Sequence, residues 1–259
     1  MSLLRSLATL FVAALISLAN AQAAERVTIA AAADLKFAMD EIATAFRKAH
    51  PGSEVELIYG SSGKFHTQLQ HDAPFDLFFS ADIGFARDLR ATGEAISEPK
   101  LYAIGRIVLW SPTRDASKMT LAVLTDPAIK KIAIANPKHA PYGKRAEEAL
   151  RSAGLWETLQ DKLVFGENIA HTAQYVQSGA ADIGIIALSL AVNKELSSKG
   201  GYALIPAEKH EPLEQAYVIT KHGRGNALAS DFAAYMDTPD ARRIMTQYGF
   251  VLPGENVAN

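Results

Sequence analysis

The chain has 259 residues, of which 49% are hydrophobic and 21% are charged. That composition indicates a globular protein and argues against a disordered, collagenous or multi-span membrane protein, and the length suits one large domain or two smaller ones. The 26 Lys and Arg residues nearly balance the 28 Asp and Glu residues, so the basic excess of a nucleic-acid-binding protein is missing.

The sequence contains no cysteine. Disulfides, thiolate metal sites, a cysteine nucleophile and a lipidated N-terminal cysteine are therefore excluded.

The first 24 residues have the pattern of a secretory signal peptide. One positive charge at Arg5 precedes an apolar run from Leu7 to Ala19, and Ala21-Gln22-Ala23 supplies a cleavage site of the A-x-A kind. The run is too short to predict a spanning helix, although an uncleaved membrane anchor is the alternative. We expect cleavage near Ala23 and a soluble, exported mature protein.

The first half of the mature chain alternates strands and helices. Apolar residues from Leu35 to Ala49 recur at helical spacing, and this helix ends near His50-Pro51-Gly52. A further helix begins near Lys64. The other predicted elements are strands at Val27–Ala31, Val55–Tyr59, Asp76–Ser80 and Ile104–Ser111 and a helix at Phe85–Ala91.

The second half continues the alternation. The predicted elements are strands at Lys131–Ala135, Ile183–Leu188 and Gln215–Thr220, and helices at Gly143–Ala153 and Ala170–Gln177. Two helices finish the chain, the last with Thr238 as N-cap, Pro239 at its first position and Gly249 at its end.

This order predicts an α/β architecture in which helices cover the sheets. The segments near Ile104–Trp110 and Gln215–Thr220 are candidates for crossings between two lobes.

Four loops share one design, in which an apolar segment gives way to small or polar residues and a helix then starts. A helix start carries unpaired N–H groups and partial positive charge, so it suits an anion. Most such loops are ordinary caps, and a single one carries little weight. Four together favour an oxyanion site; they are segments 31–35, 59–64, 140–143 and 166–169.

Hydroxyl donors and lysines accompany these loops. Ser61 and Ser62 supply hydroxyl groups, and Tyr142, between Pro141 and Gly143 in a helix-start loop, is the tyrosine that we expect to have a function. Three lysines lie near the loops and could steer an anion, although solvated surface lysines are the default interpretation; they are Lys64, Lys138 and Lys144.

Other chemistries find no support in the sequence. Segment 60–64 lacks the spacing of a Walker A loop, and no Gly-x-Ser-x-Gly segment occurs. The seven histidines show no metal-ligand spacing, so no bare metal cation is expected. Asp76 and Asp82 are better interpreted as strand-end caps than as a catalytic pair.

With these segments the chain resembles the periplasmic molybdate-binding proteins of ABC transporters, over essentially the whole mature chain. No single segment is specific, but the set of them is. The segments that carry the resemblance are residues 31–39, 60–63, 76–82, 136–143, 179–184 and 248–253.

The resemblance implies a two-lobed type II periplasmic-binding-protein fold with the ligand in the cleft between the lobes. Each lobe is then a mixed sheet flanked by helices. We expect lobe I at residues 25–105, lobe II at 106–215, and a return to lobe I at 216–259.

The resemblance also implies the ligand contacts. The family holds its oxyanion with backbone amides and hydroxyls from these four helix starts, and the corresponding residues here are Ala33, Asp34, Ser61, Ser62, Tyr142 and Ile169. Some relatives supply a tyrosine from a later strand. Ala187 occupies that place here, so we expect Tyr142 to supply the hydroxyl.

Asp34 departs from the Ser or Asn of many relatives. An ionised carboxylate facing a dianion is repulsive, and molybdate has no proton to donate to it. Our hypothesis is that the Asp34 side chain caps its own helix and that only its N–H meets the ligand.

The expected function is high-affinity binding of molybdate, and of tungstate as well, with delivery to a membrane permease. The expected protein is a periplasmic monomer without cofactor or enzymatic activity. Another oxyanion such as sulfate or phosphate is one alternative ligand. A secreted hydrolase is the alternative of a different class, but no nucleophile and base are visibly paired.

Overall fold

The computed structural model describes residues 25–115 and 118–255 of the chain. The predicted signal peptide lies outside these residues. In the described part, no helix is both long and apolar enough to cross a membrane.

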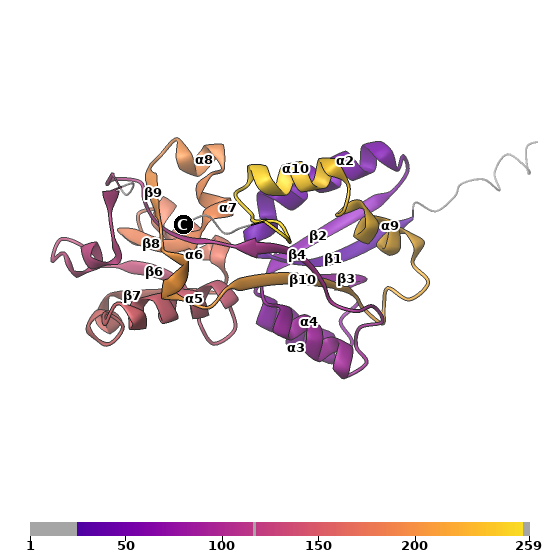
Figure 1. Ribbon diagram of the computed structural model, residues 1–259, viewed down its shortest axis with the longest axis horizontal. Helices are drawn as coiled ribbons and strands as arrows, with labels where there is room; N and C mark the ends of the chain where they lie inside the picture. Colours follow the sequence, from indigo (N-terminus) through magenta and orange to yellow (C-terminus); the bar gives the residue numbers. More distant parts are fainter. Residues whose placement is uncertain (1–24, 116–117, 256–259) are drawn as a thin grey trace, which may run out of the picture.

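Two five-stranded mixed sheets build two lobes, which lie side by side in Figure 1. The first sheet has the order β2-β1-β3-β10-β4, in which β1 runs parallel to β2 and β3, whereas β10 runs antiparallel to β3 and β4. Its strands are β1 (Arg26–Ala32), β2 (Glu54–Gly60), β3 (Leu77–Ser80), β4 (Lys100–Gly105) and β10 (Leu213–Ile219).

The second sheet repeats this plan in the order β7-β6-β8-β5-β9. Strand β6 runs parallel to β7 and β8, and β5 runs antiparallel to β8 and β9. Its strands are β5 (Ile107–Ser111), β6 (Ile132–Ala135), β7 (Leu163–Gly166), β8 (Ile183–Ala187) and β9 (Gly201–Leu204). The predicted two-lobed α/β fold is therefore confirmed.

Helices cover both faces of the first sheet (Figure 1). One face carries α2 (Lys36–Ala49), α9 (Ala227–Tyr235) and α10 (Pro239–Gln247), which bury an apolar cluster that includes Phe46, Phe79 and Phe232. The other face carries α3 (Ser62–Gln70) and α4 (Ile83–Ala91), whose Phe65 and Leu89 pack with Phe78 of β3.

One core fills the second lobe and continues to the boundary between the lobes. It is built from the apolar strands and from α5 (Pro141–Ser152), α6 (Ile169–Gln177), α7 (Leu188–Ala191) and α8 (Lys194–Ser197), and it includes Ala32, Ala33 and Ala81 of the first lobe. Short 3-10 helices lie at η1 (Ala33–Leu35), η3 (Leu121–Thr125), η4 (Glu157–Lys162) and η5 (Ala207–Lys209).

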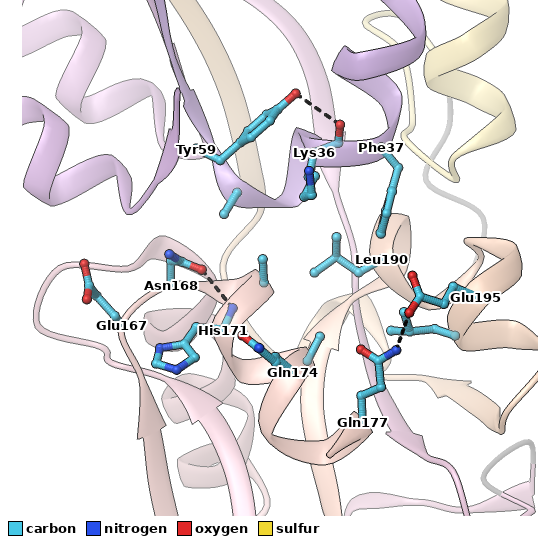
Figure 2. Close-up of a pocket in the computed structure, with 14 residues that line it drawn as sticks. Lys36, Phe37, Tyr59, Glu167, Asn168, His171, Gln174, Gln177, Leu190 and Glu195 are labelled. Carbon is cyan, nitrogen blue, oxygen red and sulfur yellow. Dashed lines mark hydrogen bonds between the residues drawn. The ribbon is translucent and has the colours of Figure 1, made fainter. Parts of the chain in front are cut away.

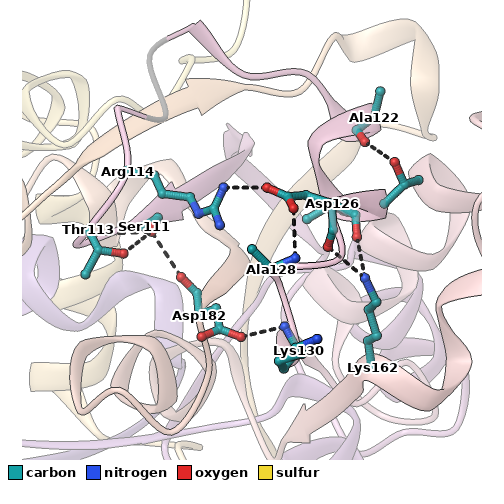
Figure 3. Close-up of polar contacts among 11 residues, drawn as sticks. Ser111, Thr113, Arg114, Ala122, Asp126, Ala128, Lys130, Lys162 and Asp182 are labelled. Carbon is teal, nitrogen blue, oxygen red and sulfur yellow. Dashed lines mark hydrogen bonds and ion pairs between the residues drawn. The ribbon is translucent and has the colours of Figure 1, made fainter.

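Polar contacts fix the outer loops of the second lobe (Figure 3). The Asp182 carboxylate accepts hydrogen bonds from the amides of Lys130 and Lys131, each at 2.8 Å, and Arg114 pairs with Asp126 at 2.9 Å. These amide donors hold the pKa of Asp182 below its usual value, since they stabilise its charged form.

One strand prediction was wrong. Residues Ile104–Ser111 do not form one strand, because β4 ends at Gly105 in the first sheet and β5 starts at Ile107 in the second. An apolar pattern that runs through both strands cannot show a change of sheet at Arg106. Strands β7 and β9, four residues each, were not predicted.

The other predicted strands and helices agree with the structure within a few residues. The last helix is capped as expected: the Thr238 side chain accepts from the Ala241 amide, and Gly249 has a φ of 75° after the helix end.

We predict that Gly143→Ala destabilises the second lobe. A Cβ at Gly143 would lie 2.1 Å from the carbonyl oxygen of Ala135, so α5 would have to move away from β6. Overpacking of this kind costs about 1–3 kcal/mol. Urea unfolding of the ligand-free protein measures the loss. The neighbouring, exposed Lys144→Ala is the control, and equal stability of both variants contradicts the prediction.

Candidate ligand-binding site

The carboxyl ends of parallel strands from both sheets meet at the boundary between the lobes, where an open α/β sheet binds its ligands. Strand β1 leads into η1 and α2, and β2 leads into α3. From the second sheet, β6 leads to α5 and β7 leads to α6. Four helix starts thus converge on one place.

A small buried cavity lies where they converge. Its empty volume is about 200 Å³, and all six residues predicted for the site line it. Each of them is at most 4% exposed. The cavity is lined by Ala32, Ala33, Asp34, Gly60, Ser61, Ser62, Ala81, Ala140, Pro141, Tyr142, Asn168 and Ile169.

A larger, open pocket adjoins the cavity (Figure 2). It has an empty volume of about 1130 Å³, and it shares Ala33 and Asn168 with the cavity. Tyr59 and Phe37 of the first lobe line one side of it, and His171 of the second lobe lines the other. The pocket and the cavity therefore meet at Ala33 and Asn168.

Backbone amides are the main donors available to the cavity. The first amides of a helix have no intrahelical acceptor, and this applies to Ser62, Tyr142 and Ile169 at the starts of α3, α5 and α6. The Asn168 side chain caps α6 by accepting from the His171 amide at 2.9 Å, so it leaves the Ile169 amide untouched.

The two serines differ in what their hydroxyl protons do. The Ser62 oxygen accepts the Ala81 amide at 3.0 Å, which leaves its own proton for the cavity. The Ser61 hydroxyl donates instead to the carbonyl oxygen of His139 in the other lobe. Ser61 therefore contributes to lobe contact, and Ser62 is the hydroxyl donor of the cavity.

Asp34 lies at the centre of a buried polar cluster. Its Oδ2 accepts the Tyr142 hydroxyl at 2.9 Å and the Gln215 amide nitrogen at 2.8 Å. The Tyr102 hydroxyl donates at 2.8 Å to Gln215 Oε1, which orients the amide. Burial raises the pKa of Asp34 to about 6, although the hydrogen bonds from Gln215 and Tyr142 lower it.

Two expectations about this cluster need correction. Asp34 is not the N-cap residue of either helix, since η1 has Ala32 and α2 has Leu35 in that place. Its carboxylate is turned mainly to Tyr142 and Gln215, with the amides of Asp34 and Leu35 as weaker partners. The Tyr142 hydroxyl is not free for a ligand, because its single proton goes to Asp34. A buried carboxylate is a strong hydrogen-bond acceptor. The Tyr142 hydroxyl and the Gln215 amide nitrogen therefore donate to Asp34.

No cation lines the cavity among its described residues. Lys64 pairs with Glu167 across the lobe boundary at 2.9 Å, and Lys138 and Lys144 line a second open pocket that meets the cavity at Ala140 and Pro141. Within the described chain no group of histidines and carboxylates is arranged to hold a metal ion. Asp82 caps α4, and Asp76 accepts the Thr28 amide, so neither of these carboxylates belongs to the site.

Sequence and structure comparisons agree with this geometry. Residues 27–251 match the family model for bacterial extracellular solute-binding proteins. The molybdate-binding protein ModA of Azotobacter vinelandii is 36% identical, covering 90% of this chain and 92% of its own; that of Rhodobacter capsulatus is also 36% identical, covering 92% and 93%.

The solved structure of the periplasmic molybdate-binding protein of Azotobacter vinelandii superposes with a TM-score of 0.83. It covers 88% of this chain and 99% of its own at 33% identity. The chain belongs to the bacterial extracellular solute-binding proteins. Within that family it groups with the molybdate-binding proteins.

The sequence analysis missed two residues that contact Asp34. Gln215 on β10 and Ser189 on α7 both contact Asp34; the Ser189 hydroxyl donates to its carbonyl oxygen at 2.7 Å. A glutamine at the start of the apolar run Ala216–Ile219 was the one available signal for Gln215. Ala187, the position of a tyrosine in some relatives, does not line the cavity.

We predict that Asp34→Asn stabilises this solute-binding protein near neutral pH. The native pKa of Asp34 lies above the unfolded one, so the native state binds the proton more tightly. Stability from this group is full below about pH 4 and is lost as pH rises through about 6, a difference of up to about 3 kcal/mol. The amide does not titrate, so the variant keeps its stability.

Urea unfolding of ligand-free protein between about pH 4 and pH 7.5 measures this difference. The difference in the free energy of unfolding between variant and wild type should grow up to about pH 6 and then stay level. Asp231→Asn, at an exposed position on α9, is the matched control. A gap that does not depend on pH would contradict the prediction.

Proposed function

We propose that this protein binds molybdate, and tungstate as well, in the cavity between its lobes and delivers it to the permease of an ABC transporter. The supporting observation is a small buried cavity surrounded by four helix starts and the Ser62 hydroxyl. No lysine or arginine is among the described residues that line it. Relatives named as molybdate-binding proteins match over nine-tenths of the chain.

A tetrahedral dianion suits such a lining. It accepts hydrogen bonds and donates none, so each lining N–H and O–H finds an acceptor. Helix dipoles bring partial positive charge to the cavity without a cation in contact. Sulfate has the same charge and shape, so the size of the cavity is what distinguishes the larger oxyanions from it.

Contacts between the lobes close the cavity. The His139 carbonyl oxygen accepts from the Ser61 hydroxyl and, at 2.9 Å, from the Gly63 amide. The Lys64–Glu167 ion pair and the Tyr142–Asp34 hydrogen bond join the same two lobes. The ligand favours this closed arrangement because donors from both lobes reach it only when the lobes meet.

Export to the periplasm and a monomeric state belong to the proposal. The pattern of residues 1–24 and a relative described as periplasmic support the location. We also propose that the protein performs no covalent chemistry. The Ser61 oxygen lies 3.0 Å from His139 Nδ1, but its proton goes to a carbonyl oxygen and Ser61 is only 3% exposed.

Calorimetric titration with molybdate, tungstate, sulfate and phosphate tests the function. Tight binding of the first two and none of the others supports it. Equal binding of sulfate would contradict selection by size. No heat with any of the four, together with turnover of ester substrates, would favour the hydrolase alternative.

We predict that Ser62→Ala weakens molybdate binding about 10- to 100-fold, because a hydrogen bond to a charged group contributes about 1.5–3 kcal/mol. Ser178→Ala, at the exposed far end of α6, should leave the dissociation constant unchanged. Titration calorimetry measures both. An unaltered affinity in Ser62→Ala would remove this hydroxyl from the site.

We predict that Gly63→Ala hinders closure. A Cβ there would lie 2.6 Å from the His139 carbonyl oxygen, which belongs to the opposite lobe. Alanine favours helix over glycine by about 1 kcal/mol, so the ligand-free stability should not fall. Molybdate affinity should fall at least tenfold, about 1.4 kcal/mol, and X-ray scattering should show a larger radius of gyration with ligand present.

Loss of ligand-free stability along with affinity would mean that the substitution damages the first lobe itself. Lys64→Ala is the matched control, because it changes the side chain next to Gly63 and leaves the glycine in place. It removes only the ion pair between Lys64 and Glu167. Both side chains are about half exposed, so the effect on molybdate affinity should be small.

A further inference from the structure

The two oxygens of the Asp34 carboxylate are used differently. Oδ2 accepts from Tyr142 and Gln215, whereas Oδ1 is buried without a well-formed hydrogen bond among the described residues. The amides of Asp34 and Leu35 lie close to the carboxylate and lower its pKa, but less than Gln215 and Tyr142 do. The side chain is 1% exposed and belongs to a residue that lines the cavity. A buried acceptor without a donor is costly, so this oxygen requires a functional explanation.

The groups around Asp34 offer no compensating positive charge in contact with it. Its hydrogen-bond partners are the neutral side chains of Tyr142 and Gln215. Tyr102 on β4 and Tyr142 on α5 are titratable groups that interact with the charge of Asp34. Tyr59 on β2, His171 on α6 and Lys36 on α2 line the adjoining open pocket, and Lys36 pairs with Asp40 at 3.3 Å. Burial raises the pKa of the tyrosines, which stay neutral near pH 7.

A dianion in this cavity would place two further negative charges beside an ionised Asp34. Water that screens such charges at a surface is displaced from a buried cavity, so the repulsion is strong. A proton on Asp34 removes one of the three charges. It also changes Oδ1 from an acceptor into a donor. The burial that raises the pKa of Asp34 to about 6 makes this proton easy to take up.

We propose that Asp34 takes up one proton from solvent when the oxyanion binds and that its Oδ1–H then donates a hydrogen bond to the ligand. This inference rests on the proposed function and assigns Asp34 as a residue that determines specificity. No covalent bond of the ligand changes. The proton moves from bulk water or buffer to Oδ1, while Oδ2 keeps its bonds from Tyr142 and Gln215.

The ligand's own protonation state then matters for selection. Molybdate and tungstate near neutral pH carry no proton, so they need the one on Asp34. Hydrogen phosphate carries its own proton and would donate it to the ionised Oδ1, with no uptake from solvent. The proton count therefore distinguishes the two ways of satisfying this oxygen.

Calorimetric titration of the mature protein with molybdate in buffers of different ionisation enthalpy measures that count. We expect close to one proton taken up per molybdate near about pH 7.5. The dissociation constant should rise about tenfold per pH unit between about pH 7 and pH 8. Tight binding with no proton uptake and no pH dependence would overturn the inference and leave the proposed function intact.

Asp34→Asn is the matched variant, since its amide is neutral at every pH. We expect its affinity to be independent of pH over the same range and its proton uptake to fall to near zero. Persistence of the wild-type slope in Asp34→Asn would overturn the assignment. Because uptake is counted on the wild-type protein, failure of the variant to fold leaves the first test decisive.

Two histidines near the cavity are the alternative proton acceptors to test. His139 contacts Ser61, and His171 follows the start of α6. The variants His139→Gln and His171→Gln should keep the proton uptake of the wild type, and loss of uptake in either would assign the proton elsewhere. Absence of molybdate binding at every pH would overturn the proposed function and this inference together.

Discussion

The hydrogen bonds to Asp34 Oδ2 connect three parts of the molecule at one buried point. Asp34 belongs to the first lobe, Tyr142 to the second, and Gln215 to the strand by which the chain returns to the first sheet. Gly105 lies beside them, and a Cβ there would come within 2.3 Å of the Tyr142 hydroxyl. The relative position of the lobes, and with it the size of the cavity, depends on this cluster.

The absence of a cation from the described lining has a further consequence. A lysine or arginine in contact would neutralise any anion of suitable size, whereas neutral donors select for the number and direction of acceptors. The charge of the ligand is then balanced by helix starts. The one ionised group left in the lining is Asp34, so its protonation state decides whether the cavity contains another acceptor or another donor.

The local features of the site were predictable because they depend on neighbours in sequence. Gly60, Ser61 and Ser62 follow an apolar strand and precede a helical pattern, and the structure places them at the start of α3. The partners of these residues were not predictable. Nothing in the sequence indicates that the Ser61 proton goes to His139, 78 residues away, while the Ser62 proton stays free.

The sequence by itself determined the alternation of strands and helices and the four helix starts, because periodicity and capping are local properties. The family resemblance implied six of the residues that line the cavity. Only the tertiary structure decided that the predicted strand at Ile104–Ser111 is two strands in different sheets, that Tyr142 donates to Asp34, and that Gln215 joins them. The last two outcomes depend on side chains 73 to 181 residues apart that compete for the same hydrogen-bond donors in a buried place. The pattern along the chain contains no information on that competition.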